Sequence, residues 1–293
     1  MASLHIRRKS SKRDDNSSDA ANDNLIVFTG RKALQSNRYL KPPCPNGQAQ
    51  RFIGSRRKLL HVADPFVALD RSVAQGKLRP SVAAKVKARG KYLLGAVARV
   101  EKAAGLRYPP YYVEPTLPLA LTSVEYGSMG AFFARVIPAA FEGRLSIIVQ
   151  FTAPLLLFGA KGTIEAVAAH EFTHYVDLVR KLSRTTILSD ERVSTLFEAG
   201  YADEERVVSP SRVFANDKTL AKLVDRKFTP NLTDAKLDEK VGKGWISKGL
   251  PTRRVTPEEN NVRLDMGTVA RTTFDPSLLE RIRAMEAVKT RRK

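Results

Sequence analysis

Residues 163–182 read TIEAVAAHEFTHYVDLVRKL, and this stretch decides most of what the sequence predicts. Thr163 is a suitable N-cap for a helix that runs from there to about Leu182. Inside this helix, residues 170–174 form the pattern H-E-x-x-H. Histidines at positions i and i+4 project from one helix face, so both imidazoles can reach a single metal ion. The sequence therefore predicts a metal-binding helix at the centre of the fold.

Glu171 lies beside the first histidine of this pattern, where its carboxylate can take a proton from a metal-bound water. Zinc is the expected metal, because it lowers the pKa of a bound water towards about 7. A core helix would rarely bury two histidines and a glutamate without a partner for their charge. We therefore expect Zn²⁺ to be bound by His170 and His174, with Glu171 as the general base.

The third protein ligand is expected to be a carboxylate. The chain has 4 histidines, and the other two, His5 and His61, lie far upstream of the motif. Asp177 shares the helix face of both motif histidines, but it lies about 10 Å along the helix axis from His170. One metal ion cannot span that length, so Asp177 is expected to support a ligand or to be a helix-surface charge.

Glu198 is the better candidate for the third ligand. If the first helix ends near Leu182 and a second begins near Asp190, the two form an antiparallel hairpin. His174 lies eight residues before the first boundary and Glu198 eight residues after the second, so the two side chains face each other. A solvent-facing helix carboxylate is the alternative interpretation of Glu198, and Glu204 and Glu205 are the alternative ligands.

The run VAAHEFTHYV at 167–176 resembles the extended zincin pattern, in which uncharged residues flank the histidines. LFEAGYADE at 196–204 resembles the glutamate-bearing helix of gluzincin metallopeptidases, and HEFTHYVD also resembles lethal-factor-type and phage-encoded zincins. The resemblance covers about residues 163–205 and implies peptide-bond hydrolysis with Glu198 as the third ligand. An acidic residue one turn later often supports a metal-bound histidine in that group. Here that position is alanine, with Asp203 next to it.

Two tyrosines are candidates for stabilising the oxyanion of such a reaction. Tyr175 and Tyr201 could each donate a hydrogen bond to it, although a buried or interfacial tyrosine is the commoner case. The substrate would be a polypeptide held in extended form along one sheet edge.

The rest of the chain predicts an α+β architecture of the zincin-like kind. A helix over residues 80–104 should back a small mixed sheet formed by residues 108–158. The apolar stretch Leu145 to Ala160 is too short to span a bilayer and fits two buried strands, or a strand and a turn. The metal helix and the glutamate helix follow, and residues 276–289 predict a last helix.

Charge divides the chain into three parts. Residues 1–105 carry a net charge of +15, residues 106–205 of −4 and residues 206–293 of +9, within a total of +20. We expect a disordered arm and linker over 1–60, a catalytic domain over 61–205 and a basic C-terminal extension over 206–293. The basic flanks suit a polyanion or a nucleoprotein assembly, or they merely keep the chain soluble.

Several functional classes remain open at this stage. The N-terminus has no apolar signal region and the single cysteine, Cys44, allows no internal disulfide, so cytoplasm or the inside of a virion is the expected location. One rival to the metallopeptidase is a structural component of a virion or other nucleoprotein assembly that has a zincin-like fold. The other is a zinc-stabilised nucleic-acid-binding protein, although structural zinc usually has four ligands and favours cysteine.

Overall fold

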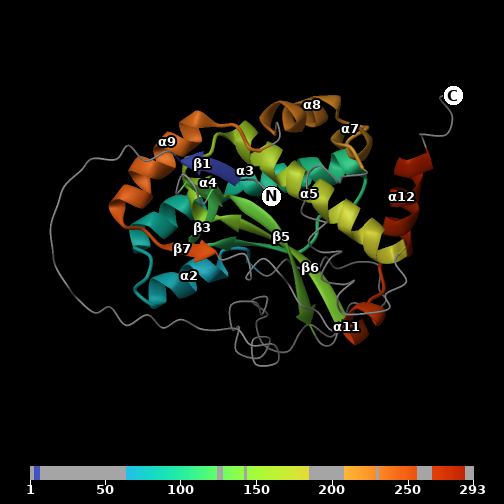
Figure 1. Cartoon of the computed structure of the whole chain (residues 1–293), viewed down its shortest axis with the longest axis horizontal. Coiled ribbons are helices and arrows are strands. Elements are labelled where there is room, and N and C mark those ends of the chain that lie inside the picture. The colour runs from blue at the N-terminus through green and yellow to red at the C-terminus, as the bar shows by residue number, and fades with distance from the viewer. Residues whose placement is uncertain are drawn as a thin grey trace.

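A computed structural model describes residues 3–6, 64–123, 128–141, 144–184, 208–228, 231–255 and 266–287. The fold is α+β, with small mixed sheets and a larger share of helix (Figure 1). In chain order the described elements are β1 (Ser3–Ile6), α2 (Val67–Ala74), α3 (Pro80–Ala104), β2 (Tyr111–Glu114), β3 (Leu117–Ser123), β4 (Ser128–Phe132), β5 (Ala134–Phe141), β6 (Arg144–Thr152), α4 (Ala153–Phe158), α5 (Lys161–Arg184), α7 (Pro210–Val213), α8 (Lys218–Lys227), α9 (Ala235–Gly244), η2 (Ile246–Lys248), β7 (Thr252–Val255), α11 (Met266–Ala270) and α12 (Pro276–Ala287).

Two mixed sheets form instead of the single sheet that the sequence predicted. One has the strand order β2-β6-β5, with β2 parallel and β5 antiparallel to β6. The other has the order β1-β4-β3-β7, with β7 parallel to β3 and the remaining pairs antiparallel. The antiparallel pairs β3–β4 and β5–β6 join strands that are close in sequence. In contrast, β1 and β7 each pair with a strand more than 100 residues away along the chain.

Helix α3 occupies the 80–104 range that the sequence predicted. Pro80 starts it, at a position where the missing N–H costs nothing, and Gly105 ends it with a φ of 67°, which a residue without Cβ adopts easily. Its buried positions recur every three or four residues and include Val86, Leu93 and Val100. This face packs against α5 and α4.

Helix α5 is the central helix of the molecule and is buried on nearly every side. Every residue from Thr163 to His174 is buried, because α3, β5, α7, α8 and α12 all contact this helix. It begins two residues before the predicted start and ends at Arg184, two residues after the predicted end. Thr163 is therefore an interior residue and not the N-cap, and its hydroxyl donates a hydrogen bond to Asp234.

The described residues of the C-terminal third of the chain belong to the same core as α5. Val213, Phe214, Leu220 and Trp245 are all buried in the hydrophobic core, and β7 completes the sheet beside β3. In Figure 1 this region lies across the top and right of the molecule as α7, α8, α9 and α12. The described part of 206–293 thus contributes side chains to the hydrophobic core that also contains α5.

Two further expectations differ from the structure. Residues Ser3–Ile6, placed by the sequence in a disordered arm, form β1 and pair with β4. Within Leu145 to Ala160, the segment after Thr152 is the short helix α4 rather than a strand or a turn. The predicted last helix is present as α12, over Pro276–Ala287. Within the described ranges, no helix has both the length and the apolar character needed to cross a membrane.

Candidate metal site

The two motif histidines meet on one face of α5. Their Nε2 atoms lie 3.0 Å apart, and the imidazole rings stand edge to face at 79° with centroids 4.7 Å apart. The hydroxyl of Thr173 donates to the backbone oxygen of His170 over 2.7 Å, within the helix turn that joins the two histidines. Both rings therefore turn the same nitrogen towards one shared point, as the i, i+4 spacing predicted.

This geometry fits a pair of zinc ligands. Two imidazole nitrogens at 2.0–2.1 Å from a tetrahedral zinc ion would lie about 3.3 Å apart, close to the 3.0 Å between Nε2 of His170 and Nε2 of His174. The two nitrogens also lie at hydrogen-bonding distance, in which case one imidazole is the donor and the other the acceptor. A small adjustment of the rings thus suffices to admit the metal.

Glu171 is buried beside the histidines and lies near Tyr108. Burial, with a smaller contribution from the negative charge of Glu171, raises the pKa of the Tyr108 phenol well above its usual value. The phenol donates a 2.8 Å hydrogen bond to the backbone oxygen of Ala168, and its ring stacks on Phe172. Tyr108 is therefore a neutral residue that supports α5 from the side of the β2-β6-β5 sheet.

Phe228, at the C-terminal end of α8, covers one face of the first histidine. Its ring is parallel to the imidazole of His170 within 8°, with centroids 3.6 Å apart. Phe228 is 8% exposed and His170 is fully buried. No sequence motif marks Phe228, because the contact joins residues 58 positions apart in the chain.

An ion-pair network holds α8 alongside α5. Arg99 on α3 binds Glu165 of α5 at 2.7 Å and Asp217 at 2.8 Å. Asp217 is the N-cap of α8, where it accepts a hydrogen bond from the backbone N–H of Leu220. The Arg99 guanidinium, together with these hydrogen bonds, holds the pKa of the Asp217 carboxyl well below its usual range. The start of α8 is fixed in this way.

A second network fixes the end of α8, next to Phe228. Lys227 binds Asp234 at 2.8 Å, and Asp234 also accepts the hydrogen bond from Thr163 of α5. Asp234 is in turn the N-cap of α9. Because Lys227 precedes Phe228 directly, these contacts hold the phenyl ring in place over His170.

Asp177 is fully buried one turn beyond His174. Its carboxylate lies 3.3 Å from Nζ of Lys181 and 3.7 Å from Nε of Arg180. Arg180 also binds Glu286 of α12 at 3.1 Å. The ion pairs of Asp177 therefore run towards α12, and the structure does not bring it to the paired imidazole nitrogens.

Tyr175 is also directed elsewhere. Its ring packs on Phe172, with centroids 5.8 Å apart, and burial, then the charge of Asp275, raises its pKa to about 12. It thus faces the C-terminal helices rather than the point shared by the two histidines.

The remaining predicted site residues lie outside the described residues; they are Glu198, Tyr201, Asp203, Glu204 and Glu205. Among the side chains that the structure does describe, no group of three His, Cys, Asp or Glu residues is placed to hold a metal ion. Among the described residues, the candidate site therefore consists of two histidines that could bind a metal and an adjacent carboxylate.

The candidate site is buried. His170, Glu171 and His174 are 0%, 1% and 1% exposed. Two surface depressions, of about 540 and 380 Å³, lie elsewhere, near the start of α5 and along α9. A polypeptide could reach the histidines only after the chain that covers them moves.

Comparison of the chain with known protein families, with curated proteins and with solved structures finds no match.

Proposed function

We propose that this protein is a zinc-dependent peptidase of the zincin-like kind. The observation that carries the proposal is the 3.0 Å approach of Nε2 of His170 to Nε2 of His174, with Glu171 buried at the adjacent position. Glu198 is the proposed third ligand. The H-E-x-x-H spacing supplies both the metal-binding pair and the base from a single helix.

The chemistry divides between the metal and the protein. Zinc, when bound, lowers the pKa of a coordinated water towards about 7 and polarises the scissile carbonyl. Glu171 accepts the proton that this water loses and delivers it to the departing amine nitrogen. His170 and His174 hold the ion, and Phe228 keeps the ring of His170 in its orientation.

A second candidate function follows from the burial of the three side chains. A catalytic zinc site keeps an open position for water and substrate, whereas these residues are at most 1% exposed. A zinc-stabilised component of a virion or other nucleoprotein assembly, or a zinc-stabilised nucleic-acid-binding protein, would need no substrate access. In those cases the metal would contribute to folding rather than to hydrolysis.

Metal analysis combined with a protease assay separates the candidates. Purified wild type should contain about one zinc per chain, and His170→Ala or His174→Ala should lose most of it. His5→Ala and His61→Ala are the matched controls and should keep the metal. Full zinc content in both motif variants would contradict the metal site itself.

Glu171→Gln then tests the catalytic proposal. The amide cannot accept the proton, so this variant should retain zinc but lose hydrolysis of a general substrate such as labelled casein. Wild-type protein that binds zinc, unfolds at lower temperature after chelation and cleaves no substrate would favour the zinc-stabilised alternative. Near-normal proteolysis by Glu171→Gln would remove Glu171 as the base.

A further inference from the structure

Two adjoining depressions form a continuous groove on the surface between α3, α4 and α9. They share Phe158 and Lys240, and α4 contacts both flanking helices. An added Cβ at Gly244 of α9 would lie 2.6 Å from Cζ of Phe158, so the α9 backbone rests directly on this ring. The residues that define this basic groove by their charge or aromatic character are Arg89, Tyr92, Phe158, Lys161, Lys240, Lys243 and Lys248.

The groove is positively charged. Five of its lining residues are Lys or Arg and only one, Glu239, is acidic. Glu239 binds Lys243 at 2.6 Å, and Arg89 donates to the backbone oxygens of Leu156 and Gly159 at the end of α4. The other three cations are exposed lysines, at positions 161, 240 and 248, and Nζ of Lys161 also lies 3.8 Å from the carboxylate of Glu165 on α5.

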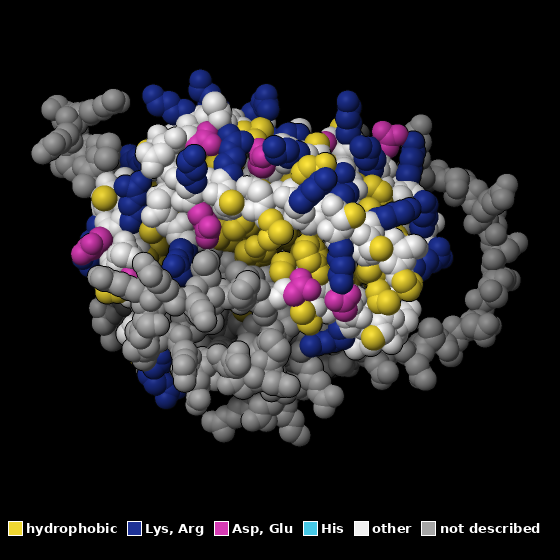
Figure 2. All heavy atoms as spheres, turned by 180° about the vertical axis from the view of Figure 1, so that it is seen from behind, with side chains coloured by type: hydrophobic (Ala, Val, Ile, Leu, Met, Phe, Trp, Pro, Cys, Tyr) yellow, Lys and Arg dark blue, Asp and Glu magenta, His cyan; other side chains and the backbone are white. Residues whose placement is uncertain are grey.

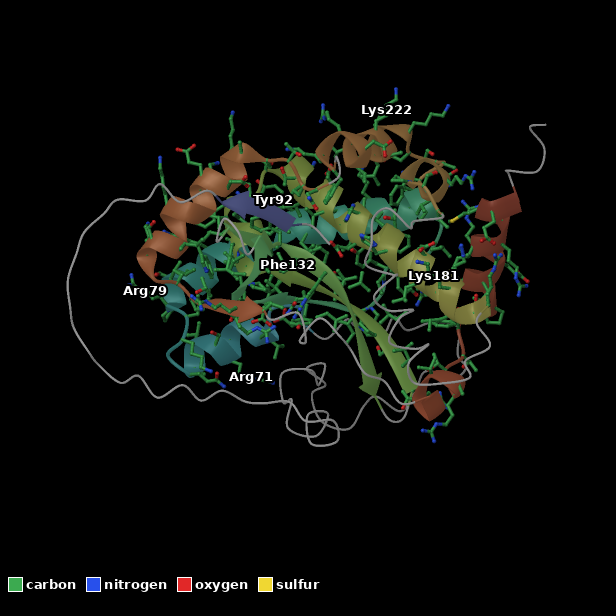
Figure 3. All side chains as sticks on the ribbon, in the orientation of Figure 1. Arg71, Arg79, Tyr92, Phe132, Lys181 and Lys222 are labelled. Carbon is green, nitrogen blue, oxygen red and sulfur yellow. The ribbon has the colours of Figure 1, made fainter. Side chains whose placement is uncertain are left out.

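Lysines continue beyond the groove along the same side of the molecule. Lys and Arg side chains stand along the upper edge of the face in Figure 2, with few acidic ones among them. Helices α8 and α9 run along that edge in Figure 1. Lys222 of α8 lies at this edge and points away from the core (Figure 3). These lysines lie outside the groove lining, so they provide the comparison that separates binding in the groove from general attraction to a basic surface.

Two aromatic rings lie among the cations of the groove. Tyr92 and Phe158 are both half-buried and line the first depression. The guanidinium carbon of Arg89 lies 5.0 Å from the Tyr92 ring centroid, and Nζ of Lys91 lies 5.5 Å from it. Aromatic rings set among cations are the usual means by which proteins bind single-stranded nucleic acid, with phosphates on the cations and bases stacked on the rings.

The same features disfavour an acidic polypeptide. A bound extended peptide usually adds to a sheet edge, whose backbone groups hydrogen-bond with it. The walls of this groove are the helices α3, α4 and α9 and the start of α5, so they offer no such edge.

We propose that the basic groove binds single-stranded nucleic acid, with phosphates at Lys161, Lys240 and Lys248 and bases stacked on Tyr92. The proposal does not depend on the proposed metal site, because the groove lies at the N-terminal end of α5, and His174 is 13 residues beyond Lys161 along that helix. Nucleic-acid binding would be a function separate from the proposed peptidase activity. It would use the positive charge that the chain concentrates at this groove.

Charge reversal inside and outside the groove tests the proposal on the full-length protein. The groove pair is Lys240→Glu with Lys248→Glu, and the matched control is Lys218→Glu with Lys222→Glu on α8. All four lysines are exposed, and both pairs change the net charge equally. Binding of a labelled oligothymidylate, followed by fluorescence anisotropy, should weaken roughly 10-fold or more in the groove pair and about 3-fold or less in the control. The salt slope of the groove pair should fall by about 1.4, or about 0.7 for each lost phosphate contact.

The aromatic contribution needs its own variants. Tyr92→Leu should weaken oligothymidylate binding roughly 10-fold, while Tyr92→Phe, which keeps the ring, should bind like wild type. Thermal unfolding midpoints close to wild type in both variants establish that folding is intact. Equal binding by Tyr92→Leu and Tyr92→Phe would overturn the stacking assignment.

Three outcomes would overturn the proposal as a whole. Equal losses in the groove pair and the α8 pair would mean diffuse attraction to the entire basic surface. A duplex that competes as well as the single strand would exclude the proposed selectivity. Polyglutamate of equal charge that competes as well as oligothymidylate would identify an acidic protein as the partner instead.

Discussion

The phenyl ring of Phe228 lies parallel to the imidazole of His170, 3.6 Å from it between centroids. His170 belongs to α5, whereas Phe228 is the C-cap residue that directly follows α8, and both are buried. A parallel ring at this distance blocks rotation of the imidazole about its Cβ–Cγ bond. Phe228 thus acts as a positioning residue, since rotation would carry the Nε2 atom of His170 away from that of His174.

Replacing Phe228 with leucine should therefore weaken zinc binding. Loss of a group that orients a metal ligand typically lowers affinity 10–100-fold, and we expect roughly 10-fold here. Phe214→Leu is the matched control, since Phe214 is also a buried phenylalanine but packs on Phe172. Competition with a chromophoric chelator measures both affinities. If the two variants lost zinc affinity equally, the effect would be a general loss of packing and not positioning of His170.

The sequence predicted those features of the fold that depend on residues within a single helix. Helix α3 was found at its observed bounds because a proline starts it, a glycine ends it and its apolar residues keep helical spacing. The H-E-x-x-H motif was visible for the same reason, since its spacing alone puts two imidazoles on one face. Both features depend on residues within one helix.

Tertiary contacts decided what the sequence did not predict. The C-terminal region is rich in lysine, and its average composition therefore predicts an exposed segment. Its buried apolar residues are scattered among these lysines; they include Val213, Phe214, Leu220 and Trp245. The stacking of Phe228 on His170 depends on how α8 docks on α5, which no local pattern encodes. The sequence also missed the division of the strands into two sheets, because strand partners are chosen by packing.

Two glycines of α3 should respond in opposite ways to alanine. Gly95 is exposed with open space around it, so Gly95→Ala should raise the free energy of unfolding by about 1 kcal/mol. At Gly90 an added Cβ would lie 2.4 Å from Cζ of Phe66, and Gly90→Ala should lower the free energy of unfolding by about 1–3 kcal/mol. Urea denaturation measures both changes. A stabilising Gly90→Ala would mean that Phe66 does not pack against α3 in solution.

The carboxyl of Asp238, in the first turn of α9, should make stability depend on pH. Burial, then the nearby charge of Asp234, raises its pKa to about 7, whereas the unfolded value is near 4. Because the pKa of Asp238 is higher in the folded state, its protonated carboxyl favours the folded state at low pH. This contribution to the free energy of unfolding is lost as the pH rises through about 7. Asp238 therefore lowers stability most above pH 7.

Asp238→Asn should remove this dependence. At pH 8 the variant should be more stable than wild type by about 1 kcal/mol, allowing for solvent screening of a half-buried group. Near pH 4 the two proteins should unfold alike. Asp225→Asn, an exposed change on α8, is the control. Thermal unfolding across this pH range is the measurement, and a gain at pH 4 equal to that at pH 8 would contradict the assignment.

The third zinc ligand is the last prediction, and the observed length of α5 changes its geometry slightly. Glu198 was predicted to face His174 on the assumption that the first helix of the hairpin ends at Leu182. In the structure, α5 continues to Arg184. Two more residues move the facing position by about 3 Å along the axis. That displacement is less than one helical turn of 5.4 Å, and Glu198 stays our predicted third ligand.

Glu198→Ala should therefore lower zinc affinity more than the Phe228 substitution does, because it removes a ligand and not a support. Hydrolysis should be lost together with the metal. Glu204→Ala and Glu205→Ala, which change the same residue type further along the chain, should leave zinc content near wild type. Equilibrium dialysis against buffered zinc gives the affinities, and circular dichroism confirms that each variant is folded. If Glu204→Ala or Glu205→Ala lost the metal while Glu198→Ala kept it, the ligand would be that residue and the site would stand. If none of the three lost zinc, the two histidines would lack a carboxylate from this segment, and the zinc-stabilised alternative would be favoured over the peptidase.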